Sequence, residues 1–133
     1  PVKQIKKINH LINDINNPFF IDNSFQIKFK KTTKISKNNI NVVTVDIQKL
    51  KFPLLLRNFK DGDSFYPFGM DGSKKVGKFL KDNNINHLDK QSAVVLVNGD
   101  NKIIWVIGMR LDNRFSVLEN TQKLLNIEYC KKN

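Results

Sequence analysis

Two apolar, β-branched runs on either side of a tight turn constrain the fold of this chain more than any other feature. Residues 93–97 and 102–107 are rich in Val and Ile, and the four residues between them are Asn98-Gly-Asp-Asn101. An Asn-Gly pair between two such runs is a strong signal for a β-hairpin, because both residues accept the backbone angles of a tight turn. The sequence therefore predicts an antiparallel sheet.

Further strands are expected elsewhere in the chain. Residues 25–29 alternate Phe, Ile and Phe with Gln and Lys, which is the period of a strand. Residues 42–46 form a second apolar run, and a last short strand is expected over residues 115–118. Apolar residues between 124 and 127 indicate a short terminal element whose type the pattern leaves open.

Two helices are predicted as well. Residues 74–81 follow Ser73, a favourable N-cap, and carry apolar residues at helical spacing. The predicted fold class is α+β, with a small antiparallel sheet packed against this short basic helix and an additional N-terminal helix that ends before Pro18. The N-terminal helix is inferred from apolar residues spaced three or four apart, namely Val2, Ile5, Ile8, Leu11, Ile12 and Ile15.

The charge of the chain favours a polyanionic partner. Lys and Arg number 23 against 12 Asp and Glu, which gives a net charge of +11 spread along the sequence. Nucleic acid is the commonest partner of such a chain. The abundance of Asn, Ile and Lys also suggests an AT-rich genome, which raises the Lys count without any functional cause.

Several kinds of chemistry find no support in the residues. One cysteine excludes an intrachain disulfide and a cysteine metal cluster. No Walker A stretch or nucleophile–base arrangement is present, so we predict no catalytic residue, no metal site and no cofactor in this chain. No apolar run is long enough to span a bilayer, and we expect a cytoplasmic protein without a membrane partner.

The basic residues of the second helix are the strongest candidates for a binding surface. Lys74, Lys78 and Lys81 share one face at i, i+4 and i+7, a pattern suited to phosphate contacts, although lysine faces are often only solvated. Phe65, Tyr66 and Phe68 lie beside these charges and either stack on bases or pack in the core. The predicted RNA-binding residues are Arg57, Lys60, Lys74, Lys75, Lys78, Lys81, Arg110 and Arg114.

A series of short motifs runs along the chain from residue 52 onward. They are Phe52-Pro-Leu-Leu-Leu-Arg57, Gly62-Asp63, Phe65-Tyr-Pro-Phe-Gly-Met70, Lys74-Lys75, Phe79-Leu80-Lys-Asp82, Ile104-Trp-Val-Ile-Gly-Met-Arg110 and Asp112-Asn-Arg114-Phe115. Their order, from residue 46 to residue 117, resembles the C-terminal domain of bacterial tRNA(Ile)-lysidine synthetase. The resemblance places Arg57, Lys74, Lys75, Arg110 and Arg114 on the family's basic motif positions.

The resemblance implies a role in tRNA modification. The family's full-length enzyme is an ATP-dependent carbon–nitrogen ligase that uses ATP with Mg and lysine to convert the first anticodon cytidine of a minor tRNA(Ile) to lysidine. Its ATP site lies in an N-terminal catalytic domain, and its C-terminal domain grips the tRNA acceptor stem. This chain alone is therefore expected to bind tRNA(Ile) and to be inactive.

The expected organisation has three parts. Residues 1–17 form a connecting amphipathic helix, residues 18–126 the tRNA-binding domain, and residues 127–133 a tail. Expected protein partners are the N-terminal catalytic domain and, in a homodimer, a second copy. The alternative hypothesis is a non-catalytic protein-interaction or structural module that docks through its N-terminal helix, with lysines that only keep it soluble.

Overall fold

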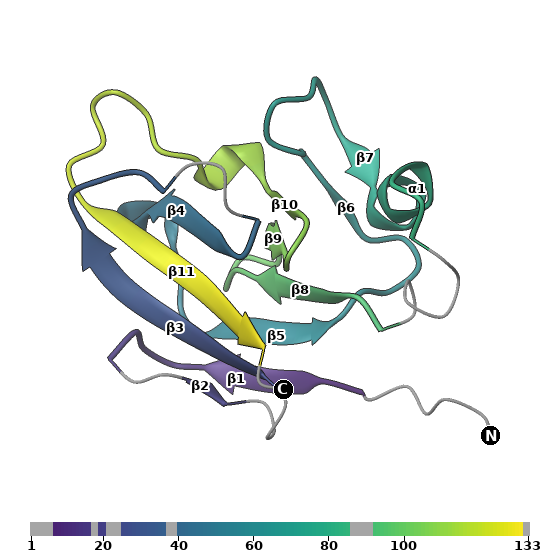
Figure 1. Cartoon of the computed structure of the whole chain (residues 1–133), viewed down its shortest axis with the longest axis horizontal. Helices are drawn as coiled ribbons and strands as arrows, with labels where there is room; N and C mark the ends of the chain where they lie inside the picture. Colours follow the sequence, from purple (N-terminus) through teal and green to yellow (C-terminus); the bar gives the residue numbers. More distant parts are fainter. Residues whose placement is uncertain (1–6, 17–18, 21–24, 37–39, 86–91, 132–133) are drawn as a thin grey trace.

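The computed structural model shows a protein built mostly from antiparallel strands in three layers (Figure 1). A four-stranded sheet forms one outer layer and a five-stranded sheet the middle layer. A two-stranded ribbon with a short helix, α1, forms the third. The structure describes residues 7–16, 19–20, 25–36, 40–85 and 92–131.

The five-stranded sheet contains the predicted hairpin, which is confirmed. Strands β8 and β9 pair antiparallel around the turn at residues 98–101. Gly99 is required in this turn for close packing, because a Cβ atom would collide with the carbonyl oxygen of Lys51. Asn101, not Gly99, adopts the left-handed backbone conformation, with φ 70°. The order is β1 (Asn9–Ile12), β5 (Leu54–Asn58), β8 (Val94–Val97), β9 (Ile103–Val106) and β10 (Arg110–Leu111).

The four-stranded sheet joins the two ends of the chain. The predicted strands at residues 25–29 and 42–46 are confirmed as β3 and β4, and the terminal element is a long strand, β11, that pairs with both. Residues 127–131, which we assigned to a tail, belong to β11, while residues 132–133 lie outside the described part. The order is β2 (Phe19–Phe20), β3 (Phe25–Thr32), β11 (Leu124–Lys131) and β4 (Val42–Asp46).

Both faces of the five-stranded sheet are buried at the hairpin strands β8 and β9, which explains why these strands are apolar at nearly every position. On one face Leu96 and Ile104 pack against residues of the four-stranded sheet such as Ile27. On the other face Val95 and Val106 pack against the ribbon and helix layer. The middle sheet therefore holds the helix layer in a fixed position.

The predicted N-terminal helix is wrong. Residues 9–12 form β1, which pairs with β5 through contacts such as Ile12 with Leu54. A spacing of four is even, so it also fits one face of a strand, and Ile8 and Ile12 are buried while Leu11 is 59% exposed. The fold is therefore mostly antiparallel β, with α1 as the one α-helix among the described residues. Residues 2–6 of the predicted helix lie outside the described part.

Two further expectations need correction. Residues 115–118 are not a strand, because Asn113–Phe115 forms a 3-10 helix, η2, and only Ser116 makes an isolated bridge to Val45. The second helix begins later than predicted. Lys74–Lys75 is a strand, β7, paired with β6 (Ser64–Phe65), and α1 covers Val76–Asp82 with Lys75 rather than Ser73 at the N-cap.

Candidate nucleic-acid interface

The helix layer presents lysines from two different elements. Val76, Phe79 and Leu80 fix α1 to the middle sheet, which leaves Lys78 and Lys81 exposed on its outer side. The prediction that Lys74, Lys78 and Lys81 share one helix face is wrong, because Lys74 does not belong to the helix. Lys74 and Lys75 belong to β7, where neighbouring side chains point to opposite sides, so that Lys75 is exposed and Lys74 half-buried.

Arg57 is committed to an internal ion pair. Its guanidinium donates two bonds to Asp63, of 2.8 and 3.1 Å, and both side chains are only 14% exposed. Asp63 also accepts from the backbone N–H of Lys60 at 2.7 Å, and its carbonyl accepts from the N–H of Val76 at 2.9 Å. Lys75 Nζ lies 3.4 Å from the neighbouring carbonyl oxygen of Gly62. Asp63 and its surroundings therefore bring Arg57, Lys60 and Lys75 together at the start of α1.

Arg114 is anchored by a second carboxylate. Asp112 is fully buried and accepts from Arg114 Nε at 3.0 Å and Nη2 at 2.9 Å. It also accepts from the backbone N–H groups of Arg114 and Tyr66. The guanidinium lies 4.5 Å from the centre of the Tyr66 ring, and the side chain remains 34% exposed. Arg114 thus has a fixed orientation and a free edge for a phosphate.

Arg110 links three elements. It begins β10, donates at 3.0 Å to the carbonyl of Phe68, and lies 5.5 Å from the centre of the Phe79 ring on α1. Arg110 and Arg114 therefore gather at the segment after β6, apart from the contacts that unite Arg57 and Lys60.

Of the three aromatic residues beside these charges, at least two of which we expected in the core, the structure buries one and exposes two. Phe65 is fully buried and packs edge-on against Phe79, with ring centres 5.2 Å apart. Tyr66, Phe68 and Met70 are exposed by 39%, 50% and 40%. Exposed aromatic rings beside arginines are typical of surfaces that bind single-stranded nucleic acid.

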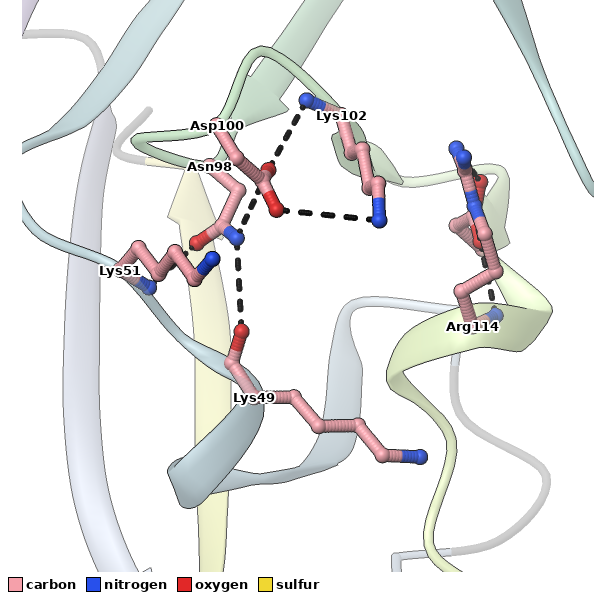
Figure 2. Close-up of polar contacts among 7 residues, drawn as sticks. Lys49, Lys51, Asn98, Asp100, Lys102 and Arg114 are labelled. Carbon is pink, nitrogen blue, oxygen red and sulfur yellow. Dashed lines mark hydrogen bonds and ion pairs between the residues drawn. The ribbon is translucent and has the colours of Figure 1, made fainter.

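A second group of lysines lies at the hairpin turn, where the sequence analysis identified none (Figure 2). Asn98 is 2% exposed and accepts from the N–H of Lys51 at 2.7 Å, while its amide donates to the carbonyl of Lys49 at 3.3 Å. Lys102 Nζ lies 3.8 Å from Asp100. These contacts bring the turn that carries Lys102 next to the backbone of Lys49 and Lys51, which are two residues apart in the sequence.

Asp100 is the carboxylate of this group. Partial burial opposes its ionisation, but bonds from the Lys102 N–H and the Asn98 amide, with the charges of Lys102 and Lys51, hold its pKa below the ordinary value of 3.8. The carboxylate therefore stays ionised and keeps the hairpin turn in place.

The described residues contain no group of three or more His, Cys, Asp and Glu side chains placed to hold a metal ion. Within the same part of the chain, α1 and the 3-10 turns are too short to cross a membrane.

Comparison with known proteins defines the family. Residues 54–129, more than half of the chain, match the family described as "TilS substrate C-terminal domain". The chain belongs to this family. This assignment confirms the resemblance inferred from the motifs.

Relatives carry the corresponding enzyme name. A tRNA(Ile)-lysidine synthase of Parabacteroides distasonis is 40% identical over 93 residues, covering 70% of this chain and 21% of the relative. A tRNA(Ile)-lysidine synthase of Caldanaerobacter subterraneus is 38% identical over 86 residues, covering 65% and 18%. The chain spans about a fifth of the length of these relatives.

Solved structures share the fold. A crystal structure of a TilS C-terminal domain superposes with a TM-score of 0.77 at 19% identity, covering 94% of this chain and 98% of that one. An N-terminal fragment of the phenylalanyl-tRNA synthetase β-subunit from Pyrococcus horikoshii gives a TM-score of 0.57 at 17% identity, covering 66% and 27%.

Proposed function

We propose that this chain is the C-terminal, tRNA-binding part of a tRNA(Ile)-lysidine synthase and that it holds the acceptor stem of the minor tRNA(Ile). The ATP- and lysine-dependent modification of the anticodon cytidine would take place in an N-terminal catalytic domain, which is the proposed protein partner. This chain would contribute binding and no reaction step. A homodimer and a cytoplasmic location remain predictions.

The observation that carries the proposal is the family match combined with the cationic surface of the helix layer. A-form RNA is recognised mainly through its shape and backbone, because side chains cannot read its deep major groove. Lysines and arginines on a rigid frame suit such recognition. The frame here is the middle sheet, to which α1 is fixed by buried side chains.

The predicted residues divide into two roles. Arg57 is largely buried and paired with Asp63, so it would position the start of α1 rather than contact RNA. Lys60, Lys75, Lys78 and Lys81 are exposed and would contact phosphates, together with the free edge of Arg114. Lys78 also lies 3.6 Å from Asp82 in an exposed pair, which is weak enough for RNA to displace.

Within residues 7–16 the structure does not support the alternative of docking through an N-terminal helix, because residues 9–12 form a strand. Ile8 and Ile12, two residues of the predicted docking face, are buried in the protein's own core.

Charge reversal on the helix layer tests the proposal. The triple variant Lys75→Glu, Lys78→Glu and Lys81→Glu, all exposed residues, should abolish the gel shift of tRNA(Ile) by this chain. The control is Lys30→Glu, Lys31→Glu and Lys34→Glu, which changes the net charge equally on exposed residues of β3 and the segment after it. Figure 1 shows β3 at the other end of the molecule from α1. Equal loss in both variants would indicate unspecific charge attraction and contradict the proposal.

A further inference from the structure

A hollow of about 490 Å³ lies beside the exposed Phe68 ring, between β4 and the segments at Leu111 and Ser116. Its size is that of a small-molecule site. Val43, Leu111 and Val117 give it apolar walls, while Thr44 and Ser116 contribute hydroxyl groups. None of the roles assigned above uses this hollow.

The backbone of Phe68 is fixed at the rim of the hollow. Its N–H donates to the Leu111 carbonyl at 2.9 Å, and its own carbonyl accepts from Arg110 Nη1 at 3.0 Å. The preceding Pro67 bridges to Asp112. The ring is nevertheless 50% exposed. An exposed aromatic ring on a fixed backbone beside an apolar hollow is suited to stacking on a flat ligand, because the backbone loses little freedom when the ligand binds.

The charge beside the rim selects the kind of ligand. Arg110 Nη1 donates to the Phe68 carbonyl, so its guanidinium lies next to the rim, whereas the Arg114 guanidinium is held by Asp112 over the Tyr66 ring. Ser116 Oγ donates to the carbonyl of Asn113 at 2.8 Å, so its lone pairs remain to accept from an amino group. A planar apolar body, an amino group and an adjacent negative charge are the features of a nucleotide.

We propose that this hollow receives an unpaired nucleobase of the bound tRNA, stacked on Phe68, while Arg110 contacts the phosphate next to it. The inference rests on the proposed tRNA-binding function. An acceptor stem ends in an unpaired 3′ segment, so a base is available next to the duplex that the helix layer would hold. The hollow would therefore bind the single-stranded end of the acceptor stem, and the lysines of the helix layer would contact its duplex.

Binding of two transcripts tests this inference. The affinity of the chain for intact tRNA(Ile) is compared, by fluorescence anisotropy, with that for a transcript that lacks the unpaired 3′ nucleotides. The intact transcript should bind roughly tenfold more tightly. Phe68→Ala should remove this preference, Phe68→Trp should keep it, and Leu11→Ala, an equally exposed apolar residue on β1, should leave it unchanged.

A spectroscopic readout separates stacking from general loss of binding. With 2-aminopurine as the terminal base, the unmodified chain and Phe68→Trp should quench its fluorescence, and Phe68→Ala should not. Equal affinity for both transcripts would overturn the inference and leave the proposed function standing. Unchanged affinity of Phe68→Ala for intact tRNA would also overturn the inference and leave the proposed function standing. An apolar protein segment would then be the better candidate occupant of the hollow. Failure to bind either transcript would overturn both.

Discussion

At the scale of single residues, buried carboxylates determine where the arginines point. Asp112 is fully buried and accepts four hydrogen bonds, from Arg114 and from the Tyr66 backbone. Asp82 makes an ion pair with Lys78, but both side chains are more than half exposed. Asp112 and Asp82 therefore allow a matched comparison of a buried and an exposed carboxylate.

We expect Asp112→Ala to lower the free energy of unfolding by about 3 kcal/mol, the low end for a broken buried pair, because Arg114 can still reach water. Asp82→Ala should cost less than about 1 kcal/mol. Urea denaturation of both variants measures the difference. Equal small losses would show that Asp112 does not organise this region.

Asp100 should make stability depend on pH. Its pKa is lower in the folded protein than the ordinary 3.8, so its contribution is present above that pH and is lost as the pH falls through the folded value. The melting temperature of Asp100→Asn should therefore lie below that of the unmodified chain at pH 7, and the gap should close below about pH 3.8. A gap that widens on acidification would contradict the assignment.

At the scale of elements, β1 provides a direct test of strand against helix. A helix would place Leu11 and Ile12 on the same apolar face, whereas the strand points them to opposite sides. Ile12→Ala should cost about 2–5 kcal/mol in unfolding free energy, because Ile12 is 3% exposed within the core. Leu11→Ala should change it by less than about 0.5 kcal/mol. Equal losses in urea denaturation would favour the helix.

The sequence predicted those strands whose type is set by neighbouring residues in the chain. The β8–β9 hairpin and β4 were predicted because turn residues and β-branched runs are sufficient to specify them. The type of β1 and β7 was not predicted, because each depends on a partner strand distant in sequence. A spacing of four between isoleucines fits both a helix and one face of a strand. The segment forms a strand because it pairs with the edge of β5.

The candidate site was predicted only in part for the same reason. The motifs contained Arg57 and Arg114 as well as Asp63 and Asp112, but not the side-chain pairing between them, which requires the turn after β5 and the 3-10 turn η2 to form. The approach of Lys102 to Lys49 and Lys51 carries no local signal, because Lys102 is distant from them in the sequence. Their grouping depends on the buried amide of Asn98 (Figure 2).

At the level of the whole molecule, the middle sheet contributes to a different core on each of its two faces. One face completes the larger core with the four-stranded sheet, and the other fixes the layer that carries the proposed RNA contacts. This arrangement allows the outer surface to be strongly basic, since the core does not depend on it. The net charge of +11 then serves association with a polyanion.

Binding of this chain to transcripts of the minor tRNA(Ile) and of elongator tRNA(Met), each at two salt concentrations, measures whether it holds tRNA(Ile) through phosphate contacts. Each phosphate neutralised by a lysine or arginine adds to the salt dependence. We expect tighter binding of tRNA(Ile) and a loss of roughly tenfold or more in affinity when the salt rises fourfold. No binding at low salt, or binding that is insensitive to salt and identical for the two tRNAs, would contradict the proposed function.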